Sequence, residues 1–418
     1  MSTDCDIIIN GGGMVGSAMA CLLADSGLSV VILESNLSPG DKKASKDIRV
    51  SALTLATKNI LDSIDAWQAV SNAKTRPAPI MEMHIWDAGS SGQIHFDSAE
   101  IGEPCLGYIT SNQQVLDSLY TQLKRRNNLK IKFDCGLKDF EITRDQVAVL
   151  TEAGETMTAS LLIGADGASS RVRTIAGLEN HGWSYNQIAI VATVESEKQH
   201  NNTAWQRFLP TGPLAFLPLA DLYQTSIVWS ADTAYANELL QLNETDFKET
   251  LGQKFENHLG EIKNVGPRNG FPLTLAHAEV YTDERLALIG DAAHRMHPLA
   301  GQGVNMGLLD AAVLAEIILG HSEQGRDFGK AFRLKAYTRW RKHDNQLMLM
   351  ATDGFKRVFG MDQSLLNNVR GMGMNFVSGL PPLRRSMMRM ASGMASGTIM
   401  GMAGNLPRAA LSSTSSRW

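Results

Sequence analysis

The sequence lacks the features of a disulfide-stabilised, membrane-spanning or nucleic-acid-binding protein. Its 418 residues include four cysteines, whose spacing matches no metal-binding pattern: Cys5, Cys21, Cys105 and Cys135. So few thiols favour a reducing compartment over a disulfide framework. No run of eighteen apolar residues predicts a transmembrane helix, and the acidic N-terminus does not resemble a signal peptide. A net charge of −4 argues against a nucleic-acid partner.

The first residues, by contrast, carry a dinucleotide-binding pattern. The apolar run Asp6–Asn10 predicts a buried strand, and a glycine-rich turn, Gly11–Gly16, follows it directly. Residues 14–26 have helical spacing, and Val30–Leu33 predicts a second strand that ends on Glu34. A strand, a glycine turn, a helix and a strand closed by an acid form the unit that binds dinucleotides.

Each residue type in this unit has a physical role. Gly11 permits the tight turn, Gly13 lets a pyrophosphate approach the backbone, and Gly16 allows close packing of helix on strand. The helix N-terminus supplies N–H groups and partial positive charge. Glu34 is placed to accept hydrogen bonds from a ribose 2′-hydroxyl, and its charge would repel the 2′-phosphate of NADP. The unit alone does not distinguish FAD from NAD.

Two further predicted strands end at polar turns. The apolar run Leu161–Gly164 leads to Asp166, and Leu286–Ile289 leads to Asp291. Open α/β sheets bind ligands at the carboxyl ends of their strands, so both acids are candidate ligand contacts. The glycine loop Pro298–Asn305 then opens onto an apolar helix, which makes a second seat for a polar or anionic group.

The order and spacing of these three motifs resemble those of the single-component flavin aromatic hydroxylases, which share the fold of para-hydroxybenzoate hydroxylase. Within that group, three segments resemble the ubiquinone-biosynthesis hydroxylases: Asp47–Ala52, Phe271–Thr274 and His297–Asn305. Ser226–Ser230 and Arg341–His343 are similar to the branch that hydroxylates a polyprenylphenol. The resemblance extends to about residue 385.

The resemblance implies an α/β fold, with a Rossmann-like FAD-binding domain, an interleaved β-rich substrate domain and a helical C-terminal segment. The expected FAD-binding domain is discontinuous and comprises residues 1–75, 105–180 and 280–345. The expected substrate-binding β-sheet domain comprises residues 76–104 and 181–279. Residues 346–418 are expected to form the helical segment and a tail.

The resemblance also implies which residues contact FAD. The turn that would hold the pyrophosphate comprises Gly11, Gly13, Met14, Val15 and Gly16, and Glu34 would hold the adenosine ribose. Arg49 lies where the family has an arginine near the flavin, Asp166 belongs to the second motif, and Asp291 would bind the ribityl chain. The residues expected to line the isoalloxazine are Pro298, Gly301, Gly303, Val304 and Asn305.

One position departs from the family. Many relatives have an arginine on the helix that begins near Asn112, where this sequence has Asn112, Gln113 and Gln114. An amide such as that of Asn112 can donate a hydrogen bond to a phosphate but cannot neutralise its charge.

The implied reaction is hydroxylation of a polyprenylphenol ring during ubiquinone biosynthesis, with oxygen delivered from O₂ through a flavin C4a-hydroperoxide. The protein must position the ring and exclude water. The sequence contains no Ser/His/Asp, HExxH or paired-carboxylate pattern, so no catalytic side chain and no metal site is predicted. For His294 and His297 a loop-fixing role is favoured over proton donation. For Trp205 and Trp229 core packing is favoured over contact with a prenyl chain.

Other functions stay open at this point. A flavin hydroxylase of a small soluble aromatic compound would share every motif, and an NAD-dependent dehydrogenase would need only the first. A non-catalytic flavoprotein scaffold in a biosynthetic complex would bind FAD without turnover. No second GxGxxG unit is present, so NAD(P)H would act as a transiently docked reductant unless another donor supplies electrons.

Charge is distributed unevenly towards the C-terminus. Residues 363–418 contain six arginines and no Asp, Glu or Lys, so the net charge of −4 divides into +6 there and −10 in residues 1–362. One hypothesis is that residues from about 380 dock anionic lipid or a partner of a ubiquinone-biosynthesis complex. The favoured alternative is a helical segment packed on the protein, followed by a disordered end. We therefore expect a cytoplasmic protein, with peripheral contact at the inner face of the membrane as the alternative.

Overall fold

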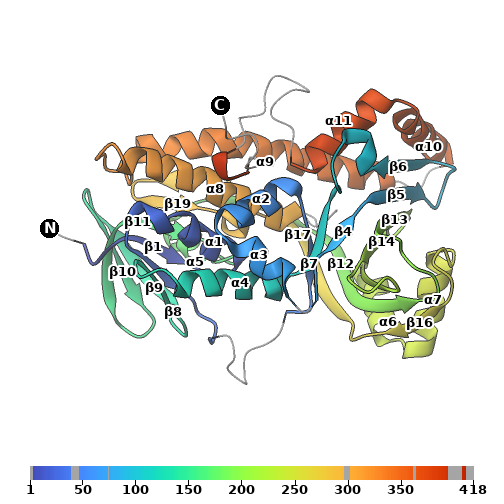
Figure 1. The fold of residues 1–418 in the computed structure, drawn as a ribbon, viewed down its shortest axis with the longest axis horizontal. Coiled ribbons are helices and arrows are strands. Elements are labelled where there is room, and N and C mark those ends of the chain that lie inside the picture. Colours follow the sequence, from blue (N-terminus) through green and yellow to red (C-terminus); the bar gives the residue numbers. More distant parts are fainter. Residues whose placement is uncertain are drawn as a thin grey trace.

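The computed structural model describes residues 3–38, 47–73, 75–295, 302–360, 364–393 and 407–410. Its described strands form sheets of eight, nine and three strands, with helices packed around them (Figure 1). The mixed α/β fold with a parallel sheet and a helical C-terminal segment confirms the predicted fold class.

The eight-stranded sheet carries the N-terminal motif. Its main path runs β18-β19-β11-β1-β2-β8, and the hairpin β9–β10 pairs with β11. The strands are β1 (Cys5–Asn10), β2 (Val30–Leu33), β8 (Leu129–Lys132), β9 (Leu137–Ile142), β10 (Val147–Thr151), β11 (Thr156–Gly164), β18 (Thr282–Asp283) and β19 (Leu286–Leu288). β1 pairs in parallel with both β2 and β11, and β11 pairs in parallel with β19. Ile7, Ile8 and Ile9 are all fully buried, as expected for a parallel strand covered on both faces.

Helices cover this sheet. α1 (Met14–Leu22) packs against α4 (Asn112–Lys124) and α8 (Gln302–Ser322), and α9 (Ala331–Gly360) packs against α8. Shorter elements complete this half: η1 (Ala24–Ser26), α2 (Leu55–Ser63), α3 (Ala66–Ser71), α5 (Arg171–Ile175) and η3 (Gly290–Ala292). By length and composition, one helix of the described residues, Gly303–Ser322 within α8, is apolar enough to cross a membrane. Of the 18-residue stretch of this helix with the highest hydropathy, 61% is buried inside the molecule, as in the core helix of a soluble protein.

The nine-stranded sheet forms the other half, with the path β20-β17-β12-β15-β14-β13-β5-β6 and β16 beside β12. Its strands are β5 (Glu82–Asp87), β6 (Gln93–Asp97), β12 (Asn180–Ser196), β13 (Thr203–Leu209), β14 (Gly212–Pro218), β15 (Gln224–Asp232), β16 (Ile262–Val265), β17 (Asn269–Ala278) and β20 (His294–Arg295). Helices α6 (Thr233–Gln241) and α7 (Glu244–Lys254) pack on it through a core that contains Trp229 and Phe247. Trp229 is fully buried, which agrees with the core role favoured for it.

A small sheet and the C-terminal helices complete the fold. β3 (Val50–Leu53), β4 (Ala78–Ile80) and β7 (Gly107–Ser111) form the three-stranded sheet, and η2 is Ser98–Ile101. α10 (Ser364–Ser378) lies on β6, α11 (Pro381–Ala391) lies on η2, and η5 (Arg408–Ala410) lies on α2. Met374 and Met388 are buried against Ile94 and Phe96, so this part of the C-terminal segment packs on the protein.

The strands follow the predicted domain ranges with a few exceptions. Every strand of the eight-stranded sheet falls in the ranges assigned to the FAD-binding domain. In the nine-stranded sheet β20 falls outside the substrate ranges, and β12 begins one residue early. The three-stranded sheet draws β4 from the substrate ranges and its other strands from the FAD-binding ranges. The domain division itself stays a prediction.

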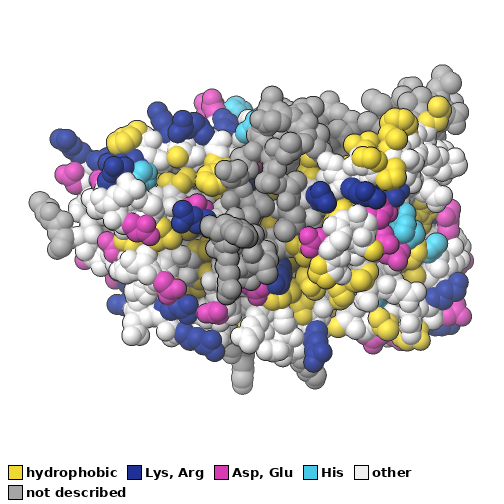
Figure 2. Space-filling view, turned by 45° about the horizontal axis from the view of Figure 1, so that its top comes forward, with side chains coloured by type: hydrophobic (Ala, Val, Ile, Leu, Met, Phe, Trp, Pro, Cys, Tyr) yellow, Lys and Arg dark blue, Asp and Glu magenta, His cyan; other side chains and the backbone are white. Residues whose placement is uncertain are grey.

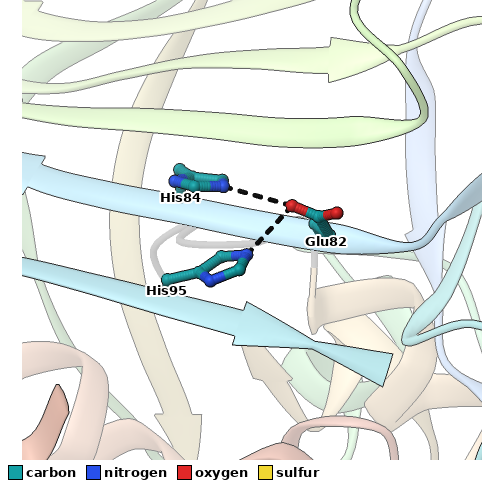
Figure 3. Close-up of side chains that lie close together, drawn as sticks. All are labelled: Glu82, His84 and His95. Atoms are coloured by element: carbon teal, nitrogen blue, oxygen red, sulfur yellow. Dashed lines mark hydrogen bonds and ion pairs between the residues drawn. The ribbon is translucent and has the colours of Figure 1, made fainter. Parts of the chain in front are cut away.

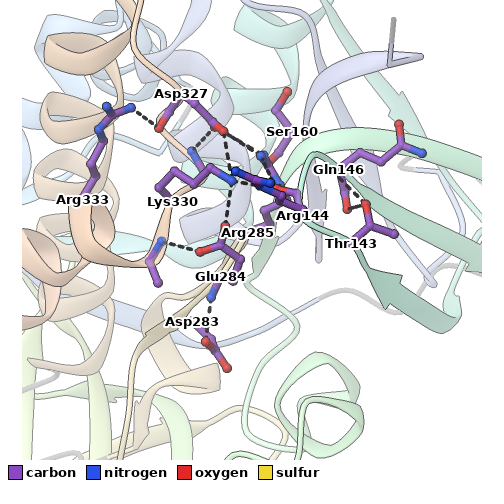
Figure 4. A network of polar contacts seen from close by, with 12 residues as sticks. Thr143, Arg144, Gln146, Ser160, Asp283, Glu284, Arg285, Asp327, Lys330 and Arg333 are labelled. Carbon is purple, nitrogen blue, oxygen red and sulfur yellow. Dashed lines mark hydrogen bonds and ion pairs between the residues drawn. The ribbon is translucent and has the colours of Figure 1, made fainter. Parts of the chain in front are cut away.

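A buried arginine ties the edge of the eight-stranded sheet to the loop between α8 and α9 (Figure 4). Arg285 donates to the carbonyl oxygens of Arg144 at 2.9 Å and Ser160 at 2.8 Å, and its guanidinium lies 2.6 Å from Asp327. Lys330 joins Arg144 to Glu284 in the same cluster. The buried guanidinium of Arg285 therefore has partners, and strand β19, which begins at the next residue, is held in place next to the third motif.

Candidate functional site

The three sequence motifs meet at one edge of the eight-stranded sheet. In the parallel register Asn10 lies opposite Gly164, and Gly164 lies opposite Leu288. The turns that follow these strand ends are therefore neighbours. A Cβ atom on Gly11 would lie 2.4 Å from the carbonyl oxygen of Ala165, which shows how closely the first two motifs touch.

The three glycines of the first turn have different surroundings. Gly11 has a φ of +109°, a conformation that favours glycine. A Cβ on Gly16 would lie 2.0 Å from the carbonyl oxygen of Gly11, so only glycine fits there. A Cβ on Gly13 would meet no atom of the described residues within 4 Å, and α1 begins at this point without a side-chain cap. Open space beside uncapped N–H groups is typical of a phosphate-binding site at a helix N-terminus.

The acid that closes β2 is already hydrogen-bonded within the protein. Glu34 is buried, and its Oε2 accepts from the N–H of Gly12 at 2.6 Å. Its Oε1 accepts from the N–H of Asn36 at 2.8 Å. Glu34 thus lies directly against the glycine turn, and its contact with an adenosine ribose stays a prediction.

The second motif is held by residues that the sequence did not single out. Asp166 Oδ2 accepts from Asn10 Nδ2 at 2.9 Å and from the N–H of Arg171 at 2.8 Å. Its Oδ1 is buried and has no partner among the described residues. Arg173 is buried and donates to the carbonyl oxygens of Ala168 at 2.9 Å and Ala292 at 2.8 Å. Arg173 therefore joins the second motif to the third.

Asp291 is the exposed acid of the third motif. Its carboxylate reaches solvent, yet the surrounding protein raises its pKa through desolvation, which His294, Arg295 and Arg49 only partly offset. An exposed carboxylate can accept hydrogen bonds from ligand hydroxyl groups. Arg49 forms a bidentate ion pair with Asp47, at distances down to 2.7 Å, which raises the pKa of the arginine.

A fully buried carboxylate anchors the loop behind Asp291. Asp310 on α8 accepts from the N–H of Gly290 at 3.1 Å and from Arg341 Nε at 2.8 Å. His294 Nε2 lies 2.5 Å from the same carboxylate. Burial alone would raise the pKa of Asp310, but His294 and Arg341 outweigh it and lower that pKa to about 2. His294 is itself buried, which agrees with its favoured role in fixing the loop.

The remaining predicted residues lie around the start of α8. Asn305 Oδ1 accepts from the N–H of Thr54 at 3.0 Å, and its Nδ2 donates to the carbonyl oxygen of Ala52 at 2.8 Å. Asn112 Oδ1 accepts from Ser51 Oγ at 2.6 Å. Both amides thus attach their helices to β3.

The rest of the glycine loop is only partly described. An added Cβ on Gly303 would have no atom of the described residues within 4 Å, Val304 is half-buried, and Val15 lies against Gly290. Pro298, Gly301 and His297 lie outside the described residues. Where many relatives have an arginine, Gln113 Nε2 donates to Asp117 and Gln114 Nε2 donates to the carbonyl oxygen of Thr75.

The donor set fits FAD. The glycine turn leaves room for a pyrophosphate only beside Gly13, and the exposed Asp291 can accept from hydroxyl groups. The orphaned Oδ1 of Asp166 can accept one more hydrogen bond at the same edge.

Solved structures share this architecture. The chain superposes on p-nitrophenol 4-monooxygenase PnpA of Pseudomonas putida DLL-E4 with a TM-score of 0.77 and 20% identity, over 94% of this chain and 99% of the other. Aklavinone-11 hydroxylase, solved with FAD and aklavinone, gives a TM-score of 0.67 at 20% identity, over 85% and 69% of the two chains. At this level of identity the likeness is one of fold.

The family match and the relatives that follow identify this chain as an FAD-dependent monooxygenase. Residues 4–352 match the FAD binding domain family, and the chain belongs to that family. It is 38% identical to ubiquinone hydroxylase UbiL of Rhodospirillum rubrum, over 93% of this chain and 89% of that protein. It is 34% identical to the human ubiquinone biosynthesis monooxygenase COQ6, over 93% and 92% of the two chains. It is 33% identical to the 3-demethoxyubiquinol 3-hydroxylase of Escherichia coli K12, over 93% of this chain and 98% of that protein.

Proposed function

We propose that this protein hydroxylates the aromatic ring of a polyprenylphenol in ubiquinone biosynthesis, using FAD and O₂. One observation carries the proposal: hydroxylases and monooxygenases of the ubiquinone pathway match 93% of the chain at 33–38% identity. The alignment spans both large sheets, so it covers the region proposed to bind substrate as well as the cofactor edge.

The chain's residues have distinct parts in this proposal. Gly11, Gly13 and Gly16 hold the pyrophosphate, Glu34 faces the adenosine ribose, and Asp291 binds the ribityl hydroxyls. Bound FAD supplies the activation of O₂ that no described side-chain cluster at this edge provides. The Asp310 network keeps the Asp291 loop in one conformation, because its members are buried and paired with one another.

An apolar cluster lies at the start of α8, next to the region where the proposed substrate ring must approach. Leu275 on β17 and Tyr185 on β12 pack against Met306, four residues into α8. Trp183 on the same strand is 48% exposed. Apolar walls favour a prenylated phenol and exclude water from the reacting oxygen. NAD(P)H is proposed as a transiently docked reductant.

The proposal extends to a peripheral membrane contact through α10 and α11. Met372 on α10 is 72% exposed and Phe376 is 65% exposed, and Met390 on α11 is 48% exposed. Arg385 and Arg389 are exposed on α11. Figure 2 shows hydrophobic and basic side chains gathered on the part of the surface where these helices lie. We propose that this surface docks on anionic lipid at the inner face of the membrane, where a polyprenyl substrate resides.

The test of the catalytic proposal is an isotope experiment with purified holoprotein. With a polyprenylphenol, NAD(P)H and ¹⁸O₂, the new hydroxyl should contain ¹⁸O, and a strain that lacks the protein should accumulate a polyprenylphenol. Oxygen from water, or unchanged ubiquinone in a strain without a paralogue, would contradict it. Rapid turnover of a small soluble phenol with none of the prenylated one would instead assign a different substrate class.

A further inference from the structure

A second group of polar side chains lies far along the chain from the flavin motifs, on the outermost hairpin of the nine-stranded sheet. β5 and β6 pair antiparallel, and β6 is the last strand of that sheet. Glu82 and His84 are two residues apart on β5, so they share one face of the sheet. His95 on β6 lies directly opposite His84. Cross-strand register therefore brings one carboxylate and two imidazoles together (Figure 3).

The three side chains aim their ligand atoms at one place. His84 Nε2 lies 3.3 Å and His95 Nε2 lies 2.9 Å from the same oxygen, Glu82 Oε2. All three ligand atoms lie within 4.8 Å of one another. A metal ion with bonds of about 2.1 Å holds neighbouring ligand atoms about 3.0–3.4 Å apart, for angles between 90° and the tetrahedral value. The observed separations from the carboxylate oxygen match that spacing.

Neighbouring rings hold the histidines in this orientation. The rings of His84 and His95 are stacked with centroids 4.1 Å apart, and Trp205 stacks on the other face of His84 at 4.6 Å. His258 packs on Trp205 at 4.3 Å. A row of four packed rings limits the rotation of both imidazoles, so little freedom would be lost when a metal binds.

The cluster is also open to solvent. The side chains of Glu82, His84 and His95 are between 35% and 43% exposed, so an ion and its water ligands can enter. Two imidazoles and one carboxylate, with water at the remaining positions, form a donor set that suits Zn²⁺. The four cysteines are all buried and do not offer competing thiolates at the surface.

We propose that Glu82, His84 and His95 form a binding site for one divalent transition-metal ion, with Zn²⁺ as the expected occupant. The ion cross-links the edge strand β6 to β5. The other face of this hairpin carries Ile94 and Phe96, which pack against α10 and α11. Metal binding therefore strengthens the platform on which the C-terminal helices rest.

The chain offers a matched control. His181 lies 3.8 Å from Glu179 and 3.9 Å from Glu279, so it also combines imidazole and carboxylate ligands. All three residues of that second cluster are exposed, and it contains one histidine. Exposed acidic groups of this kind are common without an ion, and no site is proposed there.

The experiment uses the FAD-loaded full chain, stripped with a chelator and dialysed against Zn²⁺. Wild type and His181→Ala should each retain about one equivalent of Zn²⁺, and each should show a higher Tm with the metal than without it. His95→Ala and Glu82→Gln should bind Zn²⁺ at least about tenfold more weakly, because even outer partners of a metal ligand contribute about 10–100-fold. Flavin content, measured by absorbance, shows that each variant is folded.

A second probe reports the location of the ion. Cu²⁺ binds such sites more tightly than Zn²⁺ and quenches a nearby indole. Because Trp205 stacks on His84, one equivalent of Cu²⁺ should quench part of the tryptophan fluorescence in wild type and not in His95→Ala. Equal Zn²⁺ binding by wild type, His95→Ala and Glu82→Gln would overturn the proposal, as would loss of binding in His181→Ala alone. Since no readout depends on turnover, these results are independent of the proposed hydroxylation.

Discussion

The two large sheets use polar side chains in opposite ways. At the carboxyl edge of the eight-stranded sheet, most of the polar groups are buried or half-buried and bond to one another, as in Asn10 with Asp166 and Asp310 with Arg341, while Asp291 is exposed. On the outer hairpin of the nine-stranded sheet, Glu82, His84 and His95 are half-exposed and meet across a strand pair. The first arrangement fixes backbone loops, and the second leaves ligand atoms accessible.

The difference shows what each region requires. A dinucleotide is bound largely by backbone N–H groups, so its loops must be rigid, and buried networks supply that rigidity. A metal ion is bound by side-chain atoms, which must converge but remain open to water. In the first region a substitution should therefore act through loop geometry, and in the second through the loss of one ligand.

The largest effect is expected for Gly16→Val. Its Cβ would lie 2.0 Å from the carbonyl oxygen of Gly11, a backbone atom that cannot move without breaking the turn. The variant should lose about 3 kcal/mol or more of the free energy of unfolding, and little folded holoprotein should form. Urea unfolding followed by circular dichroism measures this, and wild-type stability in the variant would contradict a rigid first turn.

Asp310→Asn is expected to cause the next largest loss of free energy of unfolding. It removes the closer of the two carboxylates that pair with the buried Arg341, whose Nη1 also lies 3.3 Å from Asp344, and breaking such a buried pair costs about 3 kcal/mol at pH 7. The pKa of Asp310 falls from 3.8 when unperturbed to about 2 in the folded protein, so ionised Asp310 stabilises the fold above about pH 4. That contribution is lost as the pH falls towards 2. The stability difference between wild type and variant should therefore shrink between pH 4 and 2, and a constant difference would contradict the assignment.

Gly13→Val separates cofactor binding from folding at the same turn. A Cβ at this position would meet no atom of the described residues within 4 Å, so the apoprotein should lose at most about 1 kcal/mol. The same side chain would occupy the space proposed for the pyrophosphate, and FAD affinity should fall by a hundredfold or more, equivalent to about 3 kcal/mol. Flavin fluorescence titration gives the affinity. Normal FAD binding in this variant would place the pyrophosphate elsewhere.

Asp291→Ala should have a smaller effect on the same titration. Losing one charge-assisted hydrogen bond to a ribityl hydroxyl costs about 1.5–3 kcal/mol, or roughly ten- to a hundredfold in FAD affinity. Because Asp291 is exposed, the apoprotein should unfold at nearly the wild-type urea concentration. Asp291→Asn serves as the conservative control and should retain part of the affinity.

The sequence predicted the first region well because its signals are local. Strand, glycine turn, helix and acid lie within thirty residues, and Cys5–Asn10, Met14–Leu22 and Val30–Leu33 form as expected. The predicted helix to residue 26 ends earlier, at Leu22, and continues as the separate turn η1. The sequence does not predict the contacts of Asn10 with Asp166 and of Arg173 with Ala292, because each joins groups more than a hundred residues apart, with no spacing signal.

The second region shows where such prediction fails. The sequence predicts a β-sheet domain that includes residues 76–104, but it predicts neither the cluster of Glu82, His84 and His95 nor a metal site. Its detection needs the exact pairing of His84 with His95, and a shift of one residue would turn His95 to the other face. Trp205, which orients His84, reaches β5 through a parallel pairing of strands more than a hundred residues apart.

In physiological salt, the smallest effect of a substitution is expected at the arginines of α11. They are of two kinds in the structure. Arg384 points inward and forms an ion pair with Glu100 at 2.8 Å, whereas Arg385 and Arg389 are exposed. Each exposed arginine near an anionic surface contributes about 1 kcal/mol, so the double variant Arg385→Gln/Arg389→Gln should bind anionic vesicles about thirtyfold more weakly at low salt. Salt of about 0.15 M should reduce this difference. Arg384→Gln should instead lower stability by at most about 1 kcal/mol and leave vesicle binding nearly unchanged. Co-sedimentation with anionic and neutral vesicles measures both variants against wild type. Equal sedimentation of all three proteins would exclude lipid docking through α11 and assign its exposed face to a protein partner.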